Sequence, residues 1–184
     1  MIETVVKSIR FNRITNNRVV LLKETAGERY LPIWIGEFEA HAIAMELQGV
    51  EAPRPLPYDL MRAMLSELGG SVEHVFVNDL SMDVFYARVV VSVNGRTIEL
   101  DSRPSDAIAL AVRSGATIFV DESVMDRAGV NLDDDDAPLD AERSGSSSPV
   151  EQRAEPRPDD EKLSIFRDFI NTLDSDEFDR GRGD

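Results

Sequence analysis

The chain has 184 residues, of which 42% are hydrophobic and none is cysteine, so it suits one ordinary domain with additional chain and excludes disulfides and thiolate metal sites. The formal charge is −15, with 13 Lys and Arg against 18 Asp and Glu in residues 1–130, so the basic footprint typical of nucleic-acid-binding proteins is missing. Neither a secretory signal nor an apolar run near the roughly 20 residues that span a bilayer is visible, and we expect a cytoplasmic protein that does not enter membranes.

The N-terminal half predicts a hairpin, a third strand and two helices. Residues 2–11 and 18–24 are rich in Val, Ile and Leu and flank a turn. Residues 30–35 predict a strand, in which Pro32 indicates an edge or a bulge. Residues 37–49 predict a helix that ends at Gly49. After a proline-rich stretch, five apolar residues recur with the spacing of one buried helix face: Leu60, Met61, Met64, Leu65 and Leu68.

The following residues predict further strands and two more helices. Residues 71–80 and 84–93 are predicted strands, and an Asn-Gly turn joins the second to a strand at 97–101. A helix that begins near Pro104, a strand at 117–120 and a short helix at 121–129 follow. Because most strand pairs resemble hairpins, we expect an α+β fold with a mixed, largely antiparallel sheet and packed helices. It would form a single compact domain over residues 1–130.

The amino-acid composition changes after this domain. Residues 131–158 are acidic, rich in Ser and Pro and poor in large apolar residues, which predicts a disordered linker. Residues 159–184 predict an amphipathic helix and tail, with a stripe of Leu163, Phe166, Ile170 and Leu173. This helix is net acidic, which disfavours a membrane-surface role. It would either fold back on the domain or offer residues 159–178 to a protein partner.

The familiar catalytic motifs are absent, so the candidate chemistry rests on carboxylates. There is no P-loop, GxGxxG, HExxH or GxSxG pattern, and the two histidines, His41 and His74, lie in different elements. Oxygen ligands would suit magnesium, manganese or calcium, and the candidates are Glu37, Glu39, Asp79, Asp83, Asp101 and Asp106. Helix dipoles, turns and capping explain each one alone. The stretch DSRPSD at 101–106, however, is denser in polar groups than capping requires, and a helix N-terminus after a strand binds anions well.

Three stretches together resemble the bifunctional nuclease domain family: LPIWIGEFEAHAIAMELQGVEAPRPLPYDLMRAML, FYARVVV and IELDSRPSDAIALAVRSGATIFV. The resemblance covers residues 1–130 in order. It implies nuclease activity on DNA and RNA and a compact α+β fold that forms homodimers. The recurrent polar positions of the family fall on Glu39, Arg54, Asp59, Asp101, Ser102, Arg103, Ser105 and Asp106.

The first interpretation is therefore a nuclease that hydrolyses phosphodiester bonds of DNA and RNA, assisted by a divalent cation (magnesium or manganese) and without an organic cofactor. Such hydrolysis needs an activated water and neutralised charge on the phosphoryl oxygens. The catalytic candidates are Glu39, Asp101, Arg103 and Asp106, and the three acids among them are also the candidate metal ligands. The substrate-binding candidates are Arg54, Ser102, Arg103 and Ser105.

Two other functions fit the same residues. In a non-enzymatic dimeric binding or regulatory module, the arginines pair internally with carboxylates and the acidic C-terminal tail recruits a partner. In a small-anion or nucleotide sensor, the ligand binds at the helix that begins near Pro104. A positive groove containing Arg54 and Arg103 favours the nuclease, whereas arginines fully engaged with internal carboxylates favour the module.

Overall fold

A computed structural model describes residues 1–12 and 17–131. Residues 13–16 and 132–184 lie outside the described part. Asn131, the first residue of the predicted disordered linker, ends a short strand instead. The expectations for the rest of the linker, 132–158, and for the helix at 159–184 remain predictions from the sequence. Residues Met1–Asn131 form one compact unit, which is described below.

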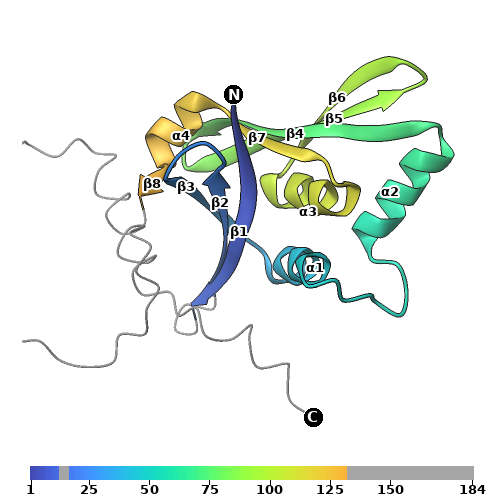
Figure 1. The fold of residues 1–184 in the computed structure, drawn as a ribbon, viewed down its shortest axis with the longest axis horizontal. Helices are drawn as coiled ribbons and strands as arrows, with labels where there is room; N and C mark the ends of the chain where they lie inside the picture. Colours follow the sequence, from blue (N-terminus) through green and yellow to red (C-terminus); the bar gives the residue numbers. More distant parts are fainter. Residues whose placement is uncertain (13–16, 132–184) are drawn as a thin grey trace, which may run out of the picture. The chain divides into compact units, whose positions relative to one another are not determined.

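The described unit is built on one eight-stranded sheet in the order β6-β5-β4-β7-β1-β2-β3-β8 (Figure 1). Among the described strands, only β4 and β7 pair in parallel. The predicted α+β fold with a mixed, largely antiparallel sheet is confirmed. The strands are β1 (Ile2–Asn12), β2 (Asn17–Glu24), β3 (Arg29–Ile35), β4 (Gly70–Ser81), β5 (Val84–Val93), β6 (Arg96–Ser102), β7 (Thr117–Val120) and β8 (Val130–Asn131).

Two meanders of three strands make up most of the sheet, and β7 joins them. Strands β1, β2 and β3 pair in succession, as do β4, β5 and β6. Strand β7 lies between β1 and β4, where Ile118 is opposite both Thr4 and Val75. The buried Thr4 hydroxyl donates a hydrogen bond of 3.1 Å to the Ile118 carbonyl. The join between the meanders is therefore both hydrogen-bonded and buried.

Two local predictions about turns and edges hold. Asn94 and Gly95 have φ of 51° and 75°, as the Asn-Gly turn between β5 and β6 requires. Pro32 pairs with Leu21 of β2, while the two residues of β8 pair only with Arg29 and Tyr30 on the other side of β3. No strand pairs with Pro32 on the β8 side of β3. A backbone N–H that proline lacks therefore costs no ladder hydrogen bond on that side.

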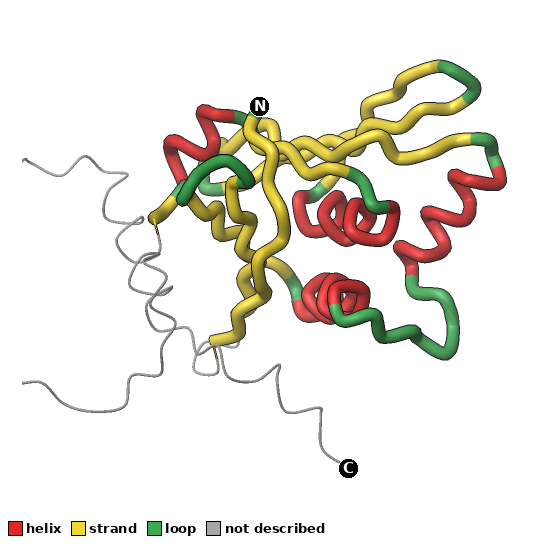
Figure 2. The backbone as a smooth tube through the Cα atoms, in the orientation of Figure 1, coloured by secondary structure: helices red, strands yellow, loops and turns green. Residues whose placement is uncertain are grey.

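Four helices pack on the sheet: α1 (Glu37–Leu47), α2 (Pro57–Glu67), α3 (Pro104–Ser114) and α4 (Glu122–Ala128). Helix α3 contacts β3, β4, β5 and β7 as well as α1 and α2, and α4 contacts β3 and β4. Because β3 and β4 are not neighbours in the sheet, these shared contacts mean that the sheet curls around α3 and α4 (Figure 2). None of the described helices has the length and apolarity that crossing a membrane requires.

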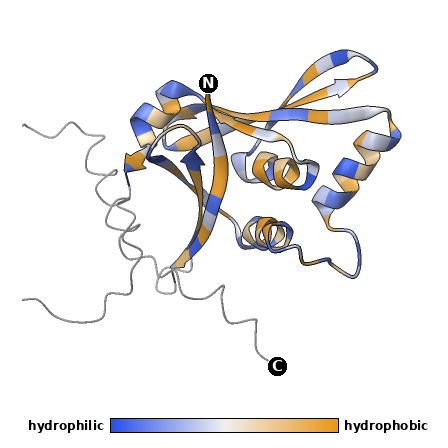
Figure 3. Ribbon diagram, viewed as in Figure 1, coloured by the Kyte–Doolittle hydropathy of each residue, from blue (hydrophilic) through white to orange (hydrophobic). Residues whose placement is uncertain are grey.

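Helix α3 is central because its sequence lets it be buried on nearly every side. Its side chains at Ala107, Ala109 and Ala111 are small and fully buried, so neighbouring elements can approach closely. Pro104 begins the helix, and Gly115 ends it with φ of 64°. Figure 3 shows α3 and α1 as largely hydrophobic ribbons beside the sheet.

The prediction that one apolar stripe of α2 is buried is wrong for four of its five residues. Leu60, Met61, Met64 and Leu68 are between 49% and 68% exposed, and only Leu65 packs partly against the core. The face of α2 that turns toward α3 instead contains Tyr58 and Leu65, and on the same face the exposed Arg62 donates to the carbonyl of Arg113. Periodicity predicted the helix correctly, but the polar contacts of Tyr58 and Arg62 determine which face turns inward.

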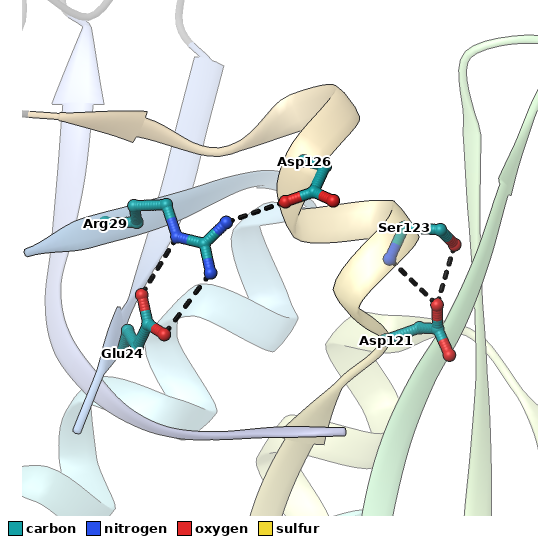
Figure 4. Close-up of polar contacts among 5 residues, drawn as sticks. All are labelled: Glu24, Arg29, Asp121, Ser123 and Asp126. Carbon is teal, nitrogen blue, oxygen red and sulfur yellow. Dashed lines mark hydrogen bonds and ion pairs between the residues drawn. The ribbon is translucent and has the colours of Figure 1, made fainter. Parts of the chain in front are cut away.

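A network around Arg29 attaches α4 to the first meander (Figure 4). The Arg29 guanidinium donates to Glu24 at 3.0 Å and to Asp126 of α4 at 2.8 Å. The hydrogen bond with Glu24 raises the pKa of Arg29, and the contact with Asp126 adds to this against the opposing effect of burial. Asp121 caps α4 by accepting the Ser123 N–H at 2.9 Å.

Candidate functional site

Four polar side chains meet where α1, α2 and α3 begin. The Arg103 guanidinium donates to both oxygens of Asp106, at 2.7 and 3.0 Å, and to Glu39 at 2.8 Å. The Tyr58 hydroxyl donates to Asp106 at 2.8 Å. We call Glu39, Tyr58, Arg103 and Asp106 the carboxylate–arginine cluster. Its bond between Arg103 and Glu39 joins residues 64 positions apart in the chain.

The local sequence explains how each member reaches the cluster. Arg103 is the N-cap residue of α3, and Pro104 fixes the first helical turn behind it, so the arginine side chain leaves the helix at its start. Asp106 lies one turn further on and directs its oxygens to Arg103 and Tyr58. Glu39 lies in the first turn of α1, and its carboxylate covers Gly36, where any side chain would collide with it.

The cluster is charged, anionic and reachable from solvent. Two carboxylates and one guanidinium give a formal charge of −1. The side chain of Arg103 is 67% exposed, whereas that of Glu39 is 15% exposed. The hydrogen bond and charge of Asp106 raise the pKa of Arg103, and Glu39 adds to the effect. Burial and the bond to Asp106 also raise the pKa of Tyr58, so its hydroxyl stays a proton donor.

A second polar contact lies behind the cluster and fastens the same three helices. Arg113 of α3 donates to Asp59 of α2 at 2.7 Å and to the carbonyl of Ala42 in α1 at 2.8 Å. Its guanidinium also lies 5.5 Å from the centre of the Tyr58 ring. Partial burial would raise the pKa of Asp59, but hydrogen bonds from the Leu56 N–H and from Arg113 outweigh it and lower this pKa.

The structure brings together only some of the residues predicted from the sequence. Glu39, Arg103 and Asp106 are in contact, but Asp101 is exposed on β6, where it lies opposite Arg88 in the strand register with β5. Since the neighbouring Ala87 and Val89 are core residues on the helix side, strand alternation places Asp101 on the opposite face of the sheet.

The substrate-binding candidates are also dispersed. Arg54 is exposed in the loop between α1 and α2, and among the described residues it is not one of those bonded to the cluster. The Ser102 hydroxyl donates to the carbonyl of Arg103 at 3.0 Å, beside the cluster. Ser105 is buried at the start of α3, with 7% exposure.

Sequence reasoning missed Tyr58 and Arg113. The sequence did indicate that two helix starts are alike, since the stretches RPLPYDL and RPSDAIAL both place an acid just inside a helix that follows Arg-Pro. In the structure these two helix starts do meet, but Tyr58 rather than Arg54 makes the contact. Arg113 is a lone cation in the apolar run ALAVRSG, and only its burial shows that it must be paired.

The oxygen ligands of the cluster suit a magnesium-type cation in part. Within residues 1–12 and 17–131 there is no group of three or more Asp, Glu or His residues that could hold a metal. Magnesium is, however, commonly bound through one or two carboxylates together with substrate phosphates and water. Glu39 and Asp106 meet that requirement, whereas Asp101 lies across the sheet from them.

A comparison with protein families decides the relationship that these features suggest. The model of the bifunctional nuclease domain matches residues 20–133, which include every member of the cluster. The chain belongs to the bifunctional nuclease domain family. The chain is also 38% identical to Uncharacterized protein Rv1829 of Mycobacterium tuberculosis over 96% of this chain and 97% of that protein.

More distant members of the bifunctional nuclease domain family come from plants. The chain is 28% identical to Bifunctional nuclease 1 of Oryza sativa subsp. japonica over 84% of this chain. It is 30% identical to Bifunctional nuclease 2 of the same plant over 61% of this chain. The matches span 46% and 35% of those two proteins, so the similarity covers half or less of each plant protein.

Proposed function

We propose that the chain is a nuclease that hydrolyses phosphodiester bonds of DNA and RNA at the carboxylate–arginine cluster. The observation that supports this most is the convergence of Glu39, Arg103 and Asp106 at three helix starts, within the region that matches the bifunctional nuclease domain. Three helix N-termini add positive potential where a phosphate would bind. The exposed guanidinium of Arg103 is the group that a phosphate would meet first.

The proposed reaction uses the cluster in two ways. Arg103 neutralises charge that develops on the phosphoryl oxygens in the transition state. The carboxylate of Glu39 or Asp106 accepts a proton from a water, whose oxygen attacks phosphorus while the bond to the leaving sugar oxygen breaks. Tyr58 donates to Asp106 and so keeps that carboxylate in one orientation.

The proposal includes a divalent cation, magnesium or manganese. Glu39 and Asp106 would hold it. When bound, such an ion would neutralise phosphate charge and lower the pKa of a bound water. A chelator should therefore reduce cleavage by the purified protein.

The decisive experiment is an assay of the highly purified full chain on single-stranded DNA and RNA, with and without chelator. Arg103→Lys keeps the charge but loses the planar fork that reaches two carboxylates and a phosphate. We expect cleavage to fall by at least about 100-fold in this variant. Arg88→Lys is the matched control, because Arg88 is also exposed and paired with an acid, Glu99, but lies outside the cluster. Cleavage that Arg103→Lys leaves unchanged would contradict the assignment of this site.

One observation favours a second candidate, a non-enzymatic binding module. The guanidinium of Arg103 is already engaged with two carboxylates of its own domain, which is the arrangement expected of a structural lock. In that case the purified wild-type chain cleaves neither substrate. The segment 159–178, through which such a module would recruit a partner, lies outside the described residues.

A further inference from the structure

The most exposed aromatic side chain among the described residues lies next to the carboxylate–arginine cluster. Phe38 is 86% exposed, whereas Tyr86, at 40%, comes next. It lies in the first turn of α1 and directly precedes Glu39, a member of the cluster. A phenyl ring at this position gains little from burial, and alanine would favour the helix more. The packing of the domain therefore does not explain why the residue is aromatic.

Both acids that flank Phe38 in the sequence are paired with arginines from other elements. Glu37 contacts Arg18 of β2 at 3.0 Å, and Glu39 contacts Arg103 at the start of α3 at 2.8 Å. The ring thus projects from a helix turn that has an ion pair on each side. A phosphate chain that approaches the ring meets guanidinium groups there, and neither flanking acid is left unpaired to repel it.

The charge of the domain indicates that phosphate contacts alone would hold a nucleic acid weakly. Residues 1–130 contain 13 bases against 18 acids, so few phosphates can be neutralised. Proteins that bind single strands add affinity by stacking bases on aromatic side chains, which tolerates any sequence because every base has a π-face. In a duplex the neighbouring bases already cover these faces, so only an unpaired or extruded base can reach such a ring.

We propose that Phe38 stacks against an unpaired base of the nucleic acid whose phosphate is bound at Arg103, so that the site selects single-stranded DNA or RNA. The inference rests on the proposed function, since it uses the same site. The surroundings of the ring favour a base over an apolar protein partner. His41, one turn further along the same face of α1, is exposed and polar, so Phe38 belongs to no continuous apolar stripe on this face.

Binding of a fluorescently labelled oligothymidylate to the full chain, in chelator to suppress cleavage, tests the proposal. We expect Phe38→Ala to weaken binding about tenfold, as for the loss of one stacked base, and Phe38→Trp to retain it. Met82→Ala is the control, because Met82 is 87% exposed but lies in the turn between β4 and β5. The Phe38→Ala variant should fold normally, since it removes an exposed side chain and alanine favours the helix.

A strand of abasic nucleotides of the same length separates stacking from phosphate contacts. It keeps every phosphate but offers no base, so Phe38→Ala should leave its affinity unchanged. An equal loss of affinity for both strands, or a loss for neither, would overturn the proposal. Equal binding of single-stranded and double-stranded DNA by the wild type would overturn it as well.

Steady-state kinetics distinguishes this inference from the proposed nuclease. Stacking holds the substrate equally in the ground state and in the transition state, so Phe38→Ala should raise KM about tenfold and leave kcat unchanged. Cleavage with an unchanged KM would refute stacking and leave the nuclease intact. Base-dependent binding that Phe38→Ala abolishes, in a wild type that cleaves nothing, would refute the nuclease and support stacking.

Discussion

The ion pair of Asp59 and Arg113 differs from the other ion pairs described because Arg113 is almost completely buried. Its side chain is 2% exposed, compared with 51% for Arg88, which pairs with Glu99. Charge buried at this depth is tolerated only when it is paired and hydrogen-bonded, and Arg113 also donates to the carbonyls of Ala42 and Ala109. The pair therefore determines how α1, α2 and α3 are fixed to one another.

Removing the carboxylate of Asp59 should destabilise the domain strongly. Asp59→Ala leaves a buried guanidinium without its counter-charge, and we expect a loss of about 3 kcal/mol or more in the free energy of unfolding. Chemical denaturation measures this loss. Glu99→Ala removes the partner of an exposed arginine and should cost less than about 1 kcal/mol. Equal losses in both variants would show that the buried contact has no special importance.

The same pair predicts an acid-dependent loss of stability. The pKa of Asp59 is lowered from 3.8 in the folded protein, so its contribution is fully present above that value and is lost as the pH falls through the folded pKa. Asp59→Asn cannot titrate. The difference in unfolding free energy between wild type and Asp59→Asn should therefore narrow below about pH 4, and a constant difference would refute this account.

At the scale of one element, α4 depends on its N-cap. Asp121 accepts from both the N–H and the hydroxyl of Ser123, and these bonds lower its pKa. Asp121→Ala should cost about 1 kcal/mol of unfolding free energy, the usual effect of losing such a cap. Asp121→Asn retains an acceptor and should recover most of that loss in thermal or chemical unfolding.

The helices also show what periodicity can and cannot predict. Helix α3 was predicted as a helix after Pro104, and burial agrees with its apolar run. Helix α2 was predicted with the same rule, but its apolar stripe faces outward. The difference arises because α2 is held by Tyr58, Asp59 and Arg62, whose partners lie 48 to 54 residues away. Contacts at that separation leave no trace in local spacing.

The candidate site was partly predictable for a similar reason. Arg103 and Asp106 lie three residues apart, so one dense motif predicted both. Glu39 was one of six candidate carboxylates, and the family resemblance marked it again. Tyr58 and Arg113 were missed because their roles depend on the angle at which three helices meet, and Asp101 lies apart from the cluster because strand alternation turns it to the other face.

At the scale of the whole molecule, the excess of acidic residues should make nucleic-acid binding depend only weakly on salt concentration. Residues 1–130 contain 18 acids and 13 bases, so few phosphates can be neutralised on binding. We expect the KM for single-stranded substrates to change less than about threefold between 50 and 200 mM salt, whereas binding with many phosphate contacts weakens about a thousandfold or more. A basic nuclease assayed in parallel supplies the contrast. A steep salt dependence would indicate an extended phosphate-binding groove in place of one local cluster.

The position of β7 has a consequence for how the protein is made. Each meander forms from consecutive residues, but the strand that joins them, Thr117–Val120, comes near the end of the domain. As the chain leaves the ribosome, the edges of β1 and β4 that pair with β7 therefore stay unpaired until residue 120 has emerged. Such edges pair readily with other chains, and pairing across this distance is intrinsically slow. The interval between the appearance of β4 and that of β7 is the stage at which the nascent protein most needs protection from aggregation.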